Sequence, residues 1–198
     1  RDLHLLSRRQ RQMCIRDSTT RELTRMIRAA HIDPKILKDR ECDPLMKEWS
    51  GAGVIFGTTG GVMEAALRSA HYLVTGRNPD PDAFKIVRNP GGQPGVVEAE
   101  IQLGDATVRA AVVSGLGNTR KLIEAIEHGE VHYDFVEVMA CRRGCIMGGG
   151  QPVPVDPESR IARSKGIYDT DINTQIKKSN ENPLVQSLYD GPVSYTHL

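Results

Sequence analysis

Two cysteines, Cys141 and Cys145, carry the strongest chemical signal in the sequence. They directly follow a predicted strand, residues 135–139, and open α/β sheets bind their ligands at the carboxyl ends of their strands. Thiolates are soft ligands that select iron–sulfur clusters, zinc or copper(I). The pair therefore predicts a thiolate-bound metal site. A Cys-x3-Cys spacing is less specific than two Cys-x2-Cys motifs, so two inert buried cysteines or a redox disulfide remain alternatives.

The residues around the two cysteines suit a bulky anionic group. Arg142 and Arg143 would lower the pKa of the neighbouring thiols and offset the negative charge of a cluster. Gly144 and the glycine run at 148–150 have no side chains, so the backbone could approach an inorganic ligand and donate N–H groups to its sulfurs. These neighbours favour the metal interpretation over the inert one.

Two further glycine-rich turns could bind a ligand. Phe56–Gly61 leads into an apolar helix predicted for residues 62–75, and glycines at a helix N-terminus suit an anion. A tight turn that lets the helix pack against a sheet is the simpler interpretation. Gly115 and Gly117 form the second turn, but Arg120 stands where a dinucleotide-binding fingerprint has its third glycine, so nicotinamide binding is not indicated there.

The elements that must position these residues indicate an α/β protein, with a parallel-sheet βαβ lobe and flanking helices. A capping box of Thr19 and Glu22 begins a helix that runs to about Ala30. Predicted strands cover residues 84–88, 96–103, 106–114 and 135–139, with turns at 91–92 and 104–105. Predicted helices cover residues 62–75, 119–128 and 158–176, the last interrupted near Gly166. Helix 119–128 would connect its flanking strands by a right-handed crossover.

The composition excludes several classes of protein. The chain has 198 residues, of which 39% are hydrophobic and 26% charged, as in ordinary globular domains. A net charge of +1 argues against a generic nucleic-acid binder. The sequence has no apolar run near the roughly 18 residues of a membrane span. Four cysteines are too few for a disulfide scaffold of this length.

The two ends are predicted not to be native protein. Codons for Met13–Ser18, read on the opposite strand in another frame, encode Val193–His197. Both ends can therefore come from one DNA element, which resembles the transposon end used in sequencing libraries. We expect residues 1–18 and 192–198 to be translated adapter and residues 19–191 to be the natural part, a partial domain. The alternative for the first segment is a natural basic arm or targeting peptide.

Two segments, Phe56–Arg68 and Glu137–Pro152, resemble signature segments of the iron-only (di-iron) hydrogenases. Val112–Asn118, and the tail formed by Arg163–Tyr168 and Lys178–Pro183, are similar to the same family. The resemblance covers nearly all of the predicted natural part and implies the C-terminal part of the active-cluster domain of the large subunit. The Arg142-Arg143 pair resembles subunits of multi-subunit, NAD(P)-linked hydrogenases.

The resemblance also implies a cofactor and a reaction. The family's cofactor is a four-iron, four-sulfur cubane joined by a cysteine to a di-iron unit, and it reversibly reduces protons to dihydrogen. Cys141 and Cys145 match two of four cluster ligands, with Cys145 as the bridging one. Pocket and cofactor-binding residues implied in the same way are Met139, Phe56, Gly57 and Gly148. The implied electron partner is ferredoxin or a flavin- or NAD(P)-binding subunit, in a cytoplasmic protein of an anaerobe, with no nucleic acid and no membrane span.

The sequence departs from the family pattern upstream of Thr19. Two further cysteine motifs are expected there, and Cys42 matches neither of them. Two thiolates cannot close a cubane that needs four, so we expect the 198-residue chain to be inactive by itself. Two alternatives remain: a hydrogenase-like iron–sulfur assembly or sensory protein without hydrogen turnover, and an unrelated α/β domain with buried cysteines.

Overall fold

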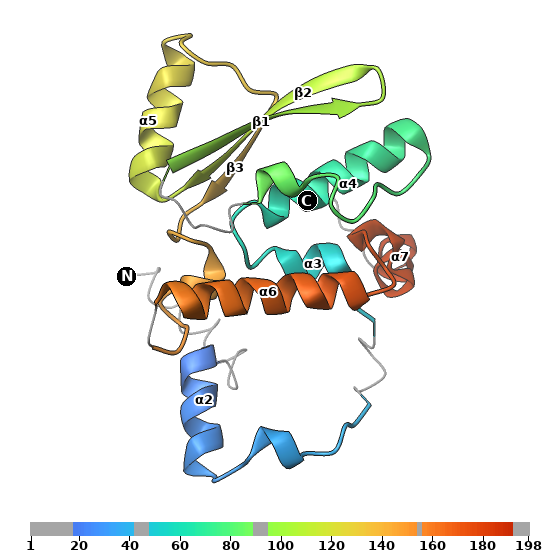
Figure 1. Ribbon diagram of the computed structural model, residues 1–198. Helices are drawn as coiled ribbons and strands as arrows, with labels where there is room; N and C mark the ends of the chain where they lie inside the picture. Colours follow the sequence, from blue (N-terminus) through green and yellow to red (C-terminus); the bar gives the residue numbers. More distant parts are fainter. Residues whose placement is uncertain (1–17, 42–47, 89–94, 154–155, 192–198) are drawn as a thin grey trace, which may run out of the picture. The chain divides into compact units, whose positions relative to one another are not determined.

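A computed structural model describes residues 18–41, 48–88, 95–153 and 156–191 of the chain (Figure 1). The chain divides into two units. The smaller one comprises residues 1–39 and 149–154, and the larger one comprises residues 40–148 and 155–198. The turn predicted at 91–92, Cys42, and all of the predicted adapter segments except Ser18 lie outside the described residues.

A three-stranded sheet forms one half of the larger unit. β1 (Gly95–Leu103) and β2 (Ala106–Ser114) form an antiparallel hairpin, closed where Leu103 pairs with Ala106. β3 (Phe135–Met139) pairs with β2 in parallel. Helix α5 (Leu116–Glu127) connects these two strands and completes the predicted βαβ unit (Figure 1). The α/β class and these three strands are confirmed.

Each face of the sheet is covered by a helix. On one face, Met63 and Leu67 of α4 (Gly61–Thr75) belong to a buried cluster with strand residues such as Ile101 and Val112. On the other face, Leu122 of α5 packs on a cluster with Ala111 and Val113 of β2. The second half of β2 is therefore buried on both faces, as expected for a central strand.

The remaining helices of the larger unit pack beside α4. α3 (Gly51–Ile55) and α6 (Pro157–Asn173) form a second core in which Ala52, Ile55 and Ala65 contact Ile167 and Tyr168. The chain then continues through the 3-10 turn η5 (Ser179–Glu181) into α7 (Pro183–Asp190). Figure 1 shows α3 running alongside α6.

The smaller unit contains α2 (Thr20–Ala29), the 3-10 turn η1 (Pro34–Ile36) and the described part of segment 149–154. The predicted capping box is present, because the Glu22 N–H donates to Thr19 Oγ1 and the Thr19 N–H donates to Glu22 Oε2, at 3.2 and 2.8 Å. The Arg21 side chain donates to the Gln151 carbonyl at 2.8 and 3.0 Å, which ties the helix to segment 149–154.

Several predicted elements are wrong in type or extent. Residues 84–88 are not a strand: η3 (Lys85–Val87) is a 3-10 turn that buries Phe84 and Val87. A short apolar run does not distinguish strand from helical turn by periodicity. α6 is continuous through Gly166 and ends at Asn173, because a single glycine weakens a helix without breaking it. α5 begins at Leu116 instead of Thr119, while α3 and α7 were not predicted.

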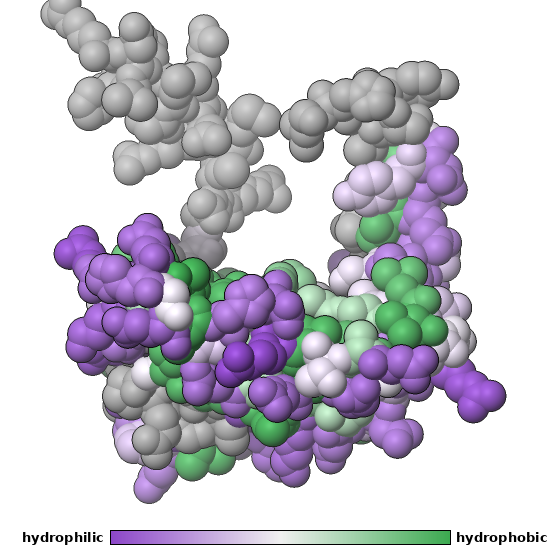
Figure 2. Space-filling model, turned by 90° about the horizontal axis from the view of Figure 1, so that it is seen from above, coloured by the Kyte–Doolittle hydropathy of each residue, from purple (hydrophilic) through white to green (hydrophobic). Residues whose placement is uncertain are grey.

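The surface of the larger unit mixes polar and apolar side chains. The last turn of α4 is exposed at Tyr72, Leu73 and Val74, although the helix is apolar along most of its length. Figure 2 shows hydrophobic and hydrophilic residues interspersed on the face that it presents. Among the described helices, none is long and apolar enough to cross a membrane.

Candidate metal-binding site

The cysteine loop, residues 140–148, begins where β3 ends at Met139. Met139 is buried, and its carbonyl accepts a hydrogen bond of 2.8 Å from the Gly115 N–H at the end of β2. Cys141 and Cys145 follow, and both are free and exposed. The alternative of two buried cysteines is therefore wrong for this chain. Both cysteines follow the carboxyl end of a parallel strand, as predicted.

The path of the cysteine loop depends on Gly144. Its φ is +83°, and a Cβ built on it would lie 2.8 Å from the Gly57 carbonyl oxygen and 2.9 Å from the Thr59 nitrogen. Arg143 before it also has a positive φ, of 70°, and its N–H donates to Ser114 Oγ at 3.2 Å. The glycine is therefore needed for close approach to a second backbone segment, a reason that the sequence analysis did not anticipate.

That second segment is the glycine loop, residues 56–61. The Ile146 N–H donates to the Gly57 carbonyl at 3.1 Å, and Gly57 itself lies beneath Ile146 and Ile167. Phe56 at the start of the loop is 46% exposed. The fold thus brings the segments that carry Phe56, Gly57 and the two cysteines side by side, although many residues separate them in sequence.

The glycine loop ends at the N-terminus of α4, where backbone N–H groups are already hydrogen-bonded to a side chain. The Glu137 carboxylate on β3 accepts from the Gly60 N–H at 2.8 Å and from the Met63 N–H at 2.6 Å. Glu137 is 4% exposed. A Cβ on Gly60 would lie only 2.1 Å from the Val87 carbonyl oxygen, so the turn serves close packing, as the simpler interpretation proposed.

Opposing effects act on the Glu137 carboxylate. Burial raises its pKa above the ordinary value, and the two backbone N–H groups act in the opposite direction. The partial positive charge of a helix N-terminus favours the ionised form. In the sequence, Glu137 stands out only as part of a segment that resembles the family, because a glutamate in a strand shows no sign of its partners.

Arginine side chains flank the cysteine loop. Arg163 of α6 donates to the Ile146 carbonyl at 2.9 Å and lies 3.7 Å from Met147 Sδ. The aliphatic part of the Arg142 side chain packs over Gly115. A Cβ added to Gly115 would lie 3.2 Å from Arg142 Cγ. Arg142 and Arg143 are exposed beside the two thiols, but their predicted effect on the thiol pKa stays a prediction. In the sequence, Arg163 could be recognised as a residue of interest only because segment Arg163–Tyr168 is similar to the family named above.

A buried ion-pair network lies on the other side of the α4 N-terminus. Glu64 of α4 accepts from Arg68 Nη2 and from Arg88 Nε and Nη2, each at 2.7 Å. Arg68 also donates to both oxygens of Asp171 on α6, at 2.8 and 2.6 Å. The Arg88 guanidinium stacks 4.4 Å from the ring centroid of Tyr168. The network therefore joins α4, α6 and the segment around η3.

The network shifts the titration of its members. Hydrogen bonds to Glu64 hold the pKa of Arg88 above its ordinary value, although burial acts against them. Burial lowers the pKa of Arg68, but bonds to Asp171 and Glu64 outweigh it. Burial also raises the pKa of Tyr168 to about 12, against a hydrogen bond with Thr58. Arg68 and Arg88 are therefore charged, and Tyr168 is neutral, at neutral pH.

The described residues do not complete a metal site. They contain no group of three or more histidine, cysteine, aspartate or glutamate side chains that could hold a metal ion. Cys141 and Cys145 are two soft donors at a position that suits a cluster, but the [4Fe–4S] type is held by four cysteines. The site thus fits half of a thiolate ligand set, and no chemistry of the cluster can be derived from these residues alone.

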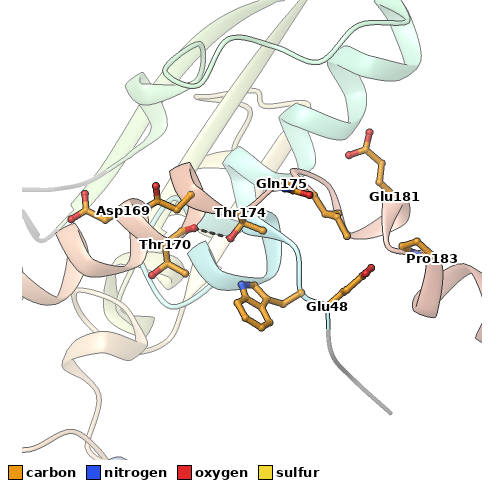
Figure 3. Close-up of a pocket in the computed structure, with 10 residues that line it drawn as sticks. Glu48, Asp169, Thr170, Thr174, Gln175, Glu181 and Pro183 are labelled. Carbon is orange, nitrogen blue, oxygen red and sulfur yellow. Dashed lines mark hydrogen bonds between the residues drawn. The ribbon is translucent and has the colours of Figure 1, made fainter. Parts of the chain in front are cut away.

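A separate cavity of about 660 Å³ opens beside the end of α6 (Figure 3). Its lining includes Thr170 and Thr174 of the segment that ends α6, and Glu48, Glu181 and Pro183 on the opposite side in Figure 3. The dashed bond in Figure 3 is the one that Thr174 Oγ1 donates to the Thr170 carbonyl at 2.7 Å. None of the predicted site residues lines this cavity.

Comparison with known protein families matches almost the whole described chain. The family described as iron only hydrogenase large subunit, C-terminal domain, matches residues 17–149. The family described as iron hydrogenase small subunit matches residues 157–193.

Individual proteins agree with these families. The chain is 42% identical over 176 residues to iron hydrogenase 1 of Clostridium pasteurianum, covering 86% of this chain and 30% of that protein. It is 48% identical over 135 residues to the periplasmic Fe hydrogenase large subunit of Nitratidesulfovibrio vulgaris, covering 68% of this chain and 31% of that protein. A variant of FeFe-hydrogenase HydA1 from Chlamydomonas reinhardtii superposes with a TM-score of 0.63 and 35% identity, over 87% of this chain and 49% of that chain.

Two other relatives differ in their named roles. The subunit HndD of an NADP-reducing hydrogenase from Solidesulfovibrio fructosivorans is 41% identical over 173 residues, covering 87% of this chain and 29% of that protein. Protein NAR1 of Arabidopsis thaliana is 28% identical over 182 residues, covering 87% of this chain and 37% of that protein. The chain spans about a third of the length of the curated relatives and about half of the solved chain.

Proposed function

Because the chain belongs to the iron-only hydrogenase family, we propose that it is the C-terminal part of an enzyme that reversibly reduces protons to dihydrogen. Cys141 and Cys145 would supply two of the four thiolates of a four-iron cluster, with Cys145 bridging to a di-iron unit. When bound, that cofactor supplies the redox chemistry, and the protein supplies ligation and a shielded pocket. Met139 and Phe56 would line this pocket, with Gly57 and Gly148 in the backbone around it.

The observation that carries the proposal is the convergence of two distant segments on one end of the sheet. The cysteine loop and the glycine loop share the bond from the Ile146 N–H to the Gly57 carbonyl, and both thiols beside it are exposed. An exposed pair of soft donors next to glycine backbone can accept a cluster, whereas two buried structural cysteines cannot. The greater identity to hydrogenases than to NAR1 favours hydrogen chemistry over a role in iron–sulfur assembly.

Isolated from the rest of the enzyme, the 198-residue chain would be inactive. Its described residues provide two of the required four thiolates, and we propose that the others lie upstream in the full-length protein. We also propose that residues 1–18 and 192–198 are adapter-derived. The electron partner would be ferredoxin or a flavin- or NAD(P)-binding subunit, and the likeness to HndD supports the second. A cytoplasmic location stays a prediction, since one relative is named as periplasmic.

The decisive experiment uses the complete gene. The full-length protein would be produced anaerobically with its cluster-assembly machinery, and hydrogen evolution from a reduced viologen dye would be measured together with the iron content. A C145A variant is the matched control, and we expect it to lose hydrogen evolution. Cluster-loaded wild-type protein without hydrogen turnover would favour the assembly or sensory role. A complete gene without further cysteines upstream of Thr19 would refute the hydrogenase assignment.

A further inference from the structure

We propose that Glu137 is a positioning residue of the candidate metal site, whose buried carboxylate fixes the cysteine loop against the glycine loop. The effect of this role on a bound cluster rests on the function proposed above, whereas the hydrogen bonds of Glu137 do not depend on that function. Glu137 touches none of the predicted cluster ligands and would act through the two backbone segments that it joins.

Strand β3 places Glu137 directly upstream of the site. Glu137 and Met139 are both buried on the same face of the strand, whereas Val138 between them is 49% exposed. Cys141 follows two residues after Met139. Since neighbouring residues in a strand are rigidly spaced, a force that holds Glu137 in place also holds the start of the cysteine loop.

The partners of the carboxylate belong to the other segment. The Gly60 and Met63 N–H groups that it accepts from are 77 and 74 residues away in sequence. Gly60 lies in the same short loop as Phe56 and Gly57. One side chain therefore connects β3, which leads into the cysteine loop, to the glycine loop, which carries the predicted pocket residue Phe56.

The geometry needs a side chain with two acceptor oxygens. Each carboxylate oxygen of Glu137 accepts from one N–H, and a glutamine at this position would direct its own NH2 group at one of these donors. Other contacts between the two loops are the backbone bond from Ile146 to Gly57, the close approach of Gly144 and the packing of the Ile146 side chain on Gly57. Replacing Glu137 removes the hydrogen-bonded carboxylate and leaves these contacts in place.

The test compares E137Q, E137D and wild type in the full-length protein, with E100Q as the matched control. Glu100 lies on β1 of the same sheet, and its side chain is 69% exposed. Hydrogen–deuterium exchange would be followed on the peptide that contains Gly60 and Met63, with and without iron. We expect E137Q to exchange these amides about ten- to hundredfold faster than wild type, E137D to show a smaller increase, and E100Q to show none.

A second readout concerns the cluster itself. In iron-loaded protein, we expect E137Q to shift the electron paramagnetic resonance spectrum of the reduced cluster at unchanged iron content, because the cysteine loop is less firmly held. Loss of global stability alone would speed exchange throughout the sheet and leave that spectrum as in wild type, which would overturn the proposal. If E137Q does not fold, the same two comparisons are made between E137D and E100Q.

The two proposals fail in different ways. Unchanged exchange at Gly60 and Met63 in E137Q, in a protein that evolves hydrogen, would overturn the role of Glu137 and leave the enzyme assignment standing. Faster exchange in a protein that binds clusters without evolving hydrogen would support the positioning role and refute the hydrogenase function.

Discussion

Replacing Glu64 by glutamine should be among the most destabilising single changes in the larger unit. Glu64 is 1% exposed, and its carboxylate accepts three charged hydrogen bonds of 2.7 Å from Arg68 and Arg88. In E64Q, Arg68 keeps both oxygens of Asp171, but Arg88 keeps only the exposed Asp82 as a carboxylate partner among the described residues. A buried guanidinium would then lack a buried counter-charge.

The size of the effect follows from that imbalance. Breaking a buried ion pair by removing one partner costs about 3–5 kcal/mol. Glutamine still accepts one hydrogen bond through its carbonyl oxygen, so we expect a loss of about 3 kcal/mol in the free energy of unfolding. The double variant E64M/R88M removes both charges of one pair, and replacing a whole pair by apolar residues is often nearly neutral. It should therefore be less destabilised than the sum of the two single variants.

Urea unfolding followed by circular dichroism would measure these differences. The control is D169N, which breaks the exposed pair of Lys165 and Asp169 on α6. Exposed pairs of this kind contribute about 0–1 kcal/mol, so D169N should unfold close to wild type. If E64Q also unfolds within about 1 kcal/mol of wild type, the network does not join the helices as we infer.

Three further predictions concern the site and its surroundings. G144A should destabilise the protein by at least about 2 kcal/mol, because of its positive φ and the contact with the glycine loop. G117A, where nothing crowds an added Cβ, should be neutral or gain up to about 1 kcal/mol; equal urea midpoints for the two variants would contradict this. Burial raises the pKa of Tyr168 to about 12 from its ordinary value of 10.0, so the unfolded chain loses this proton first. The stability contributed by the neutral tyrosine is therefore present below pH 10 and lost as the pH rises toward 12, and Y168F should lose less stability over that window; parallel curves would refute the shift. Cys141 and Cys145 should react with iodoacetamide in the native, metal-free chain, as peptide mass spectrometry would detect, and protection until unfolding would contradict their exposure.

Local patterns were sufficient for most of the fold. β2 and β3 were predicted with their observed bounds, and β1 nearly so, because their alternating or continuous apolar residues are bounded by polar or glycine-containing turns. The capping box at Thr19 fixed the start of α2 for the same local reason. The failures occurred where tertiary contacts decide. Phe84 and Val87 could face the core from a strand or from a 3-10 turn, and the pairing of Arg88 with Glu64 accompanies the turn.

The candidate site also has residues that local sequence reveals and residues that only tertiary contacts reveal. Cys141, Cys145 and the glycine loop were visible as residue types with a characteristic spacing, so their chemistry could be predicted without their positions. Glu137 could not be found in this way, because its importance lies in partners more than 70 residues away. Gly144 was predicted as a glycine that allows a ligand to approach, whereas its near neighbours in the structure are backbone atoms of the glycine loop.

The groups that shape the site and the groups that would bind the cluster differ in burial. Glu137, Gly60 and Gly144 are buried and fully engaged with other parts of the larger unit, whereas Cys141 and Cys145 are exposed. The path of the cysteine loop is thus set by contacts that the described chain already contains, because its residues bond to Ser114 of β2, to the glycine loop and to Arg163 of α6. On the proposed function, the rest of the enzyme would need to bring its own thiolates to a preformed half of the site. It would not need to fold the cysteine loop, since iron ligation would add to an arrangement that backbone hydrogen bonds and one buried carboxylate already maintain.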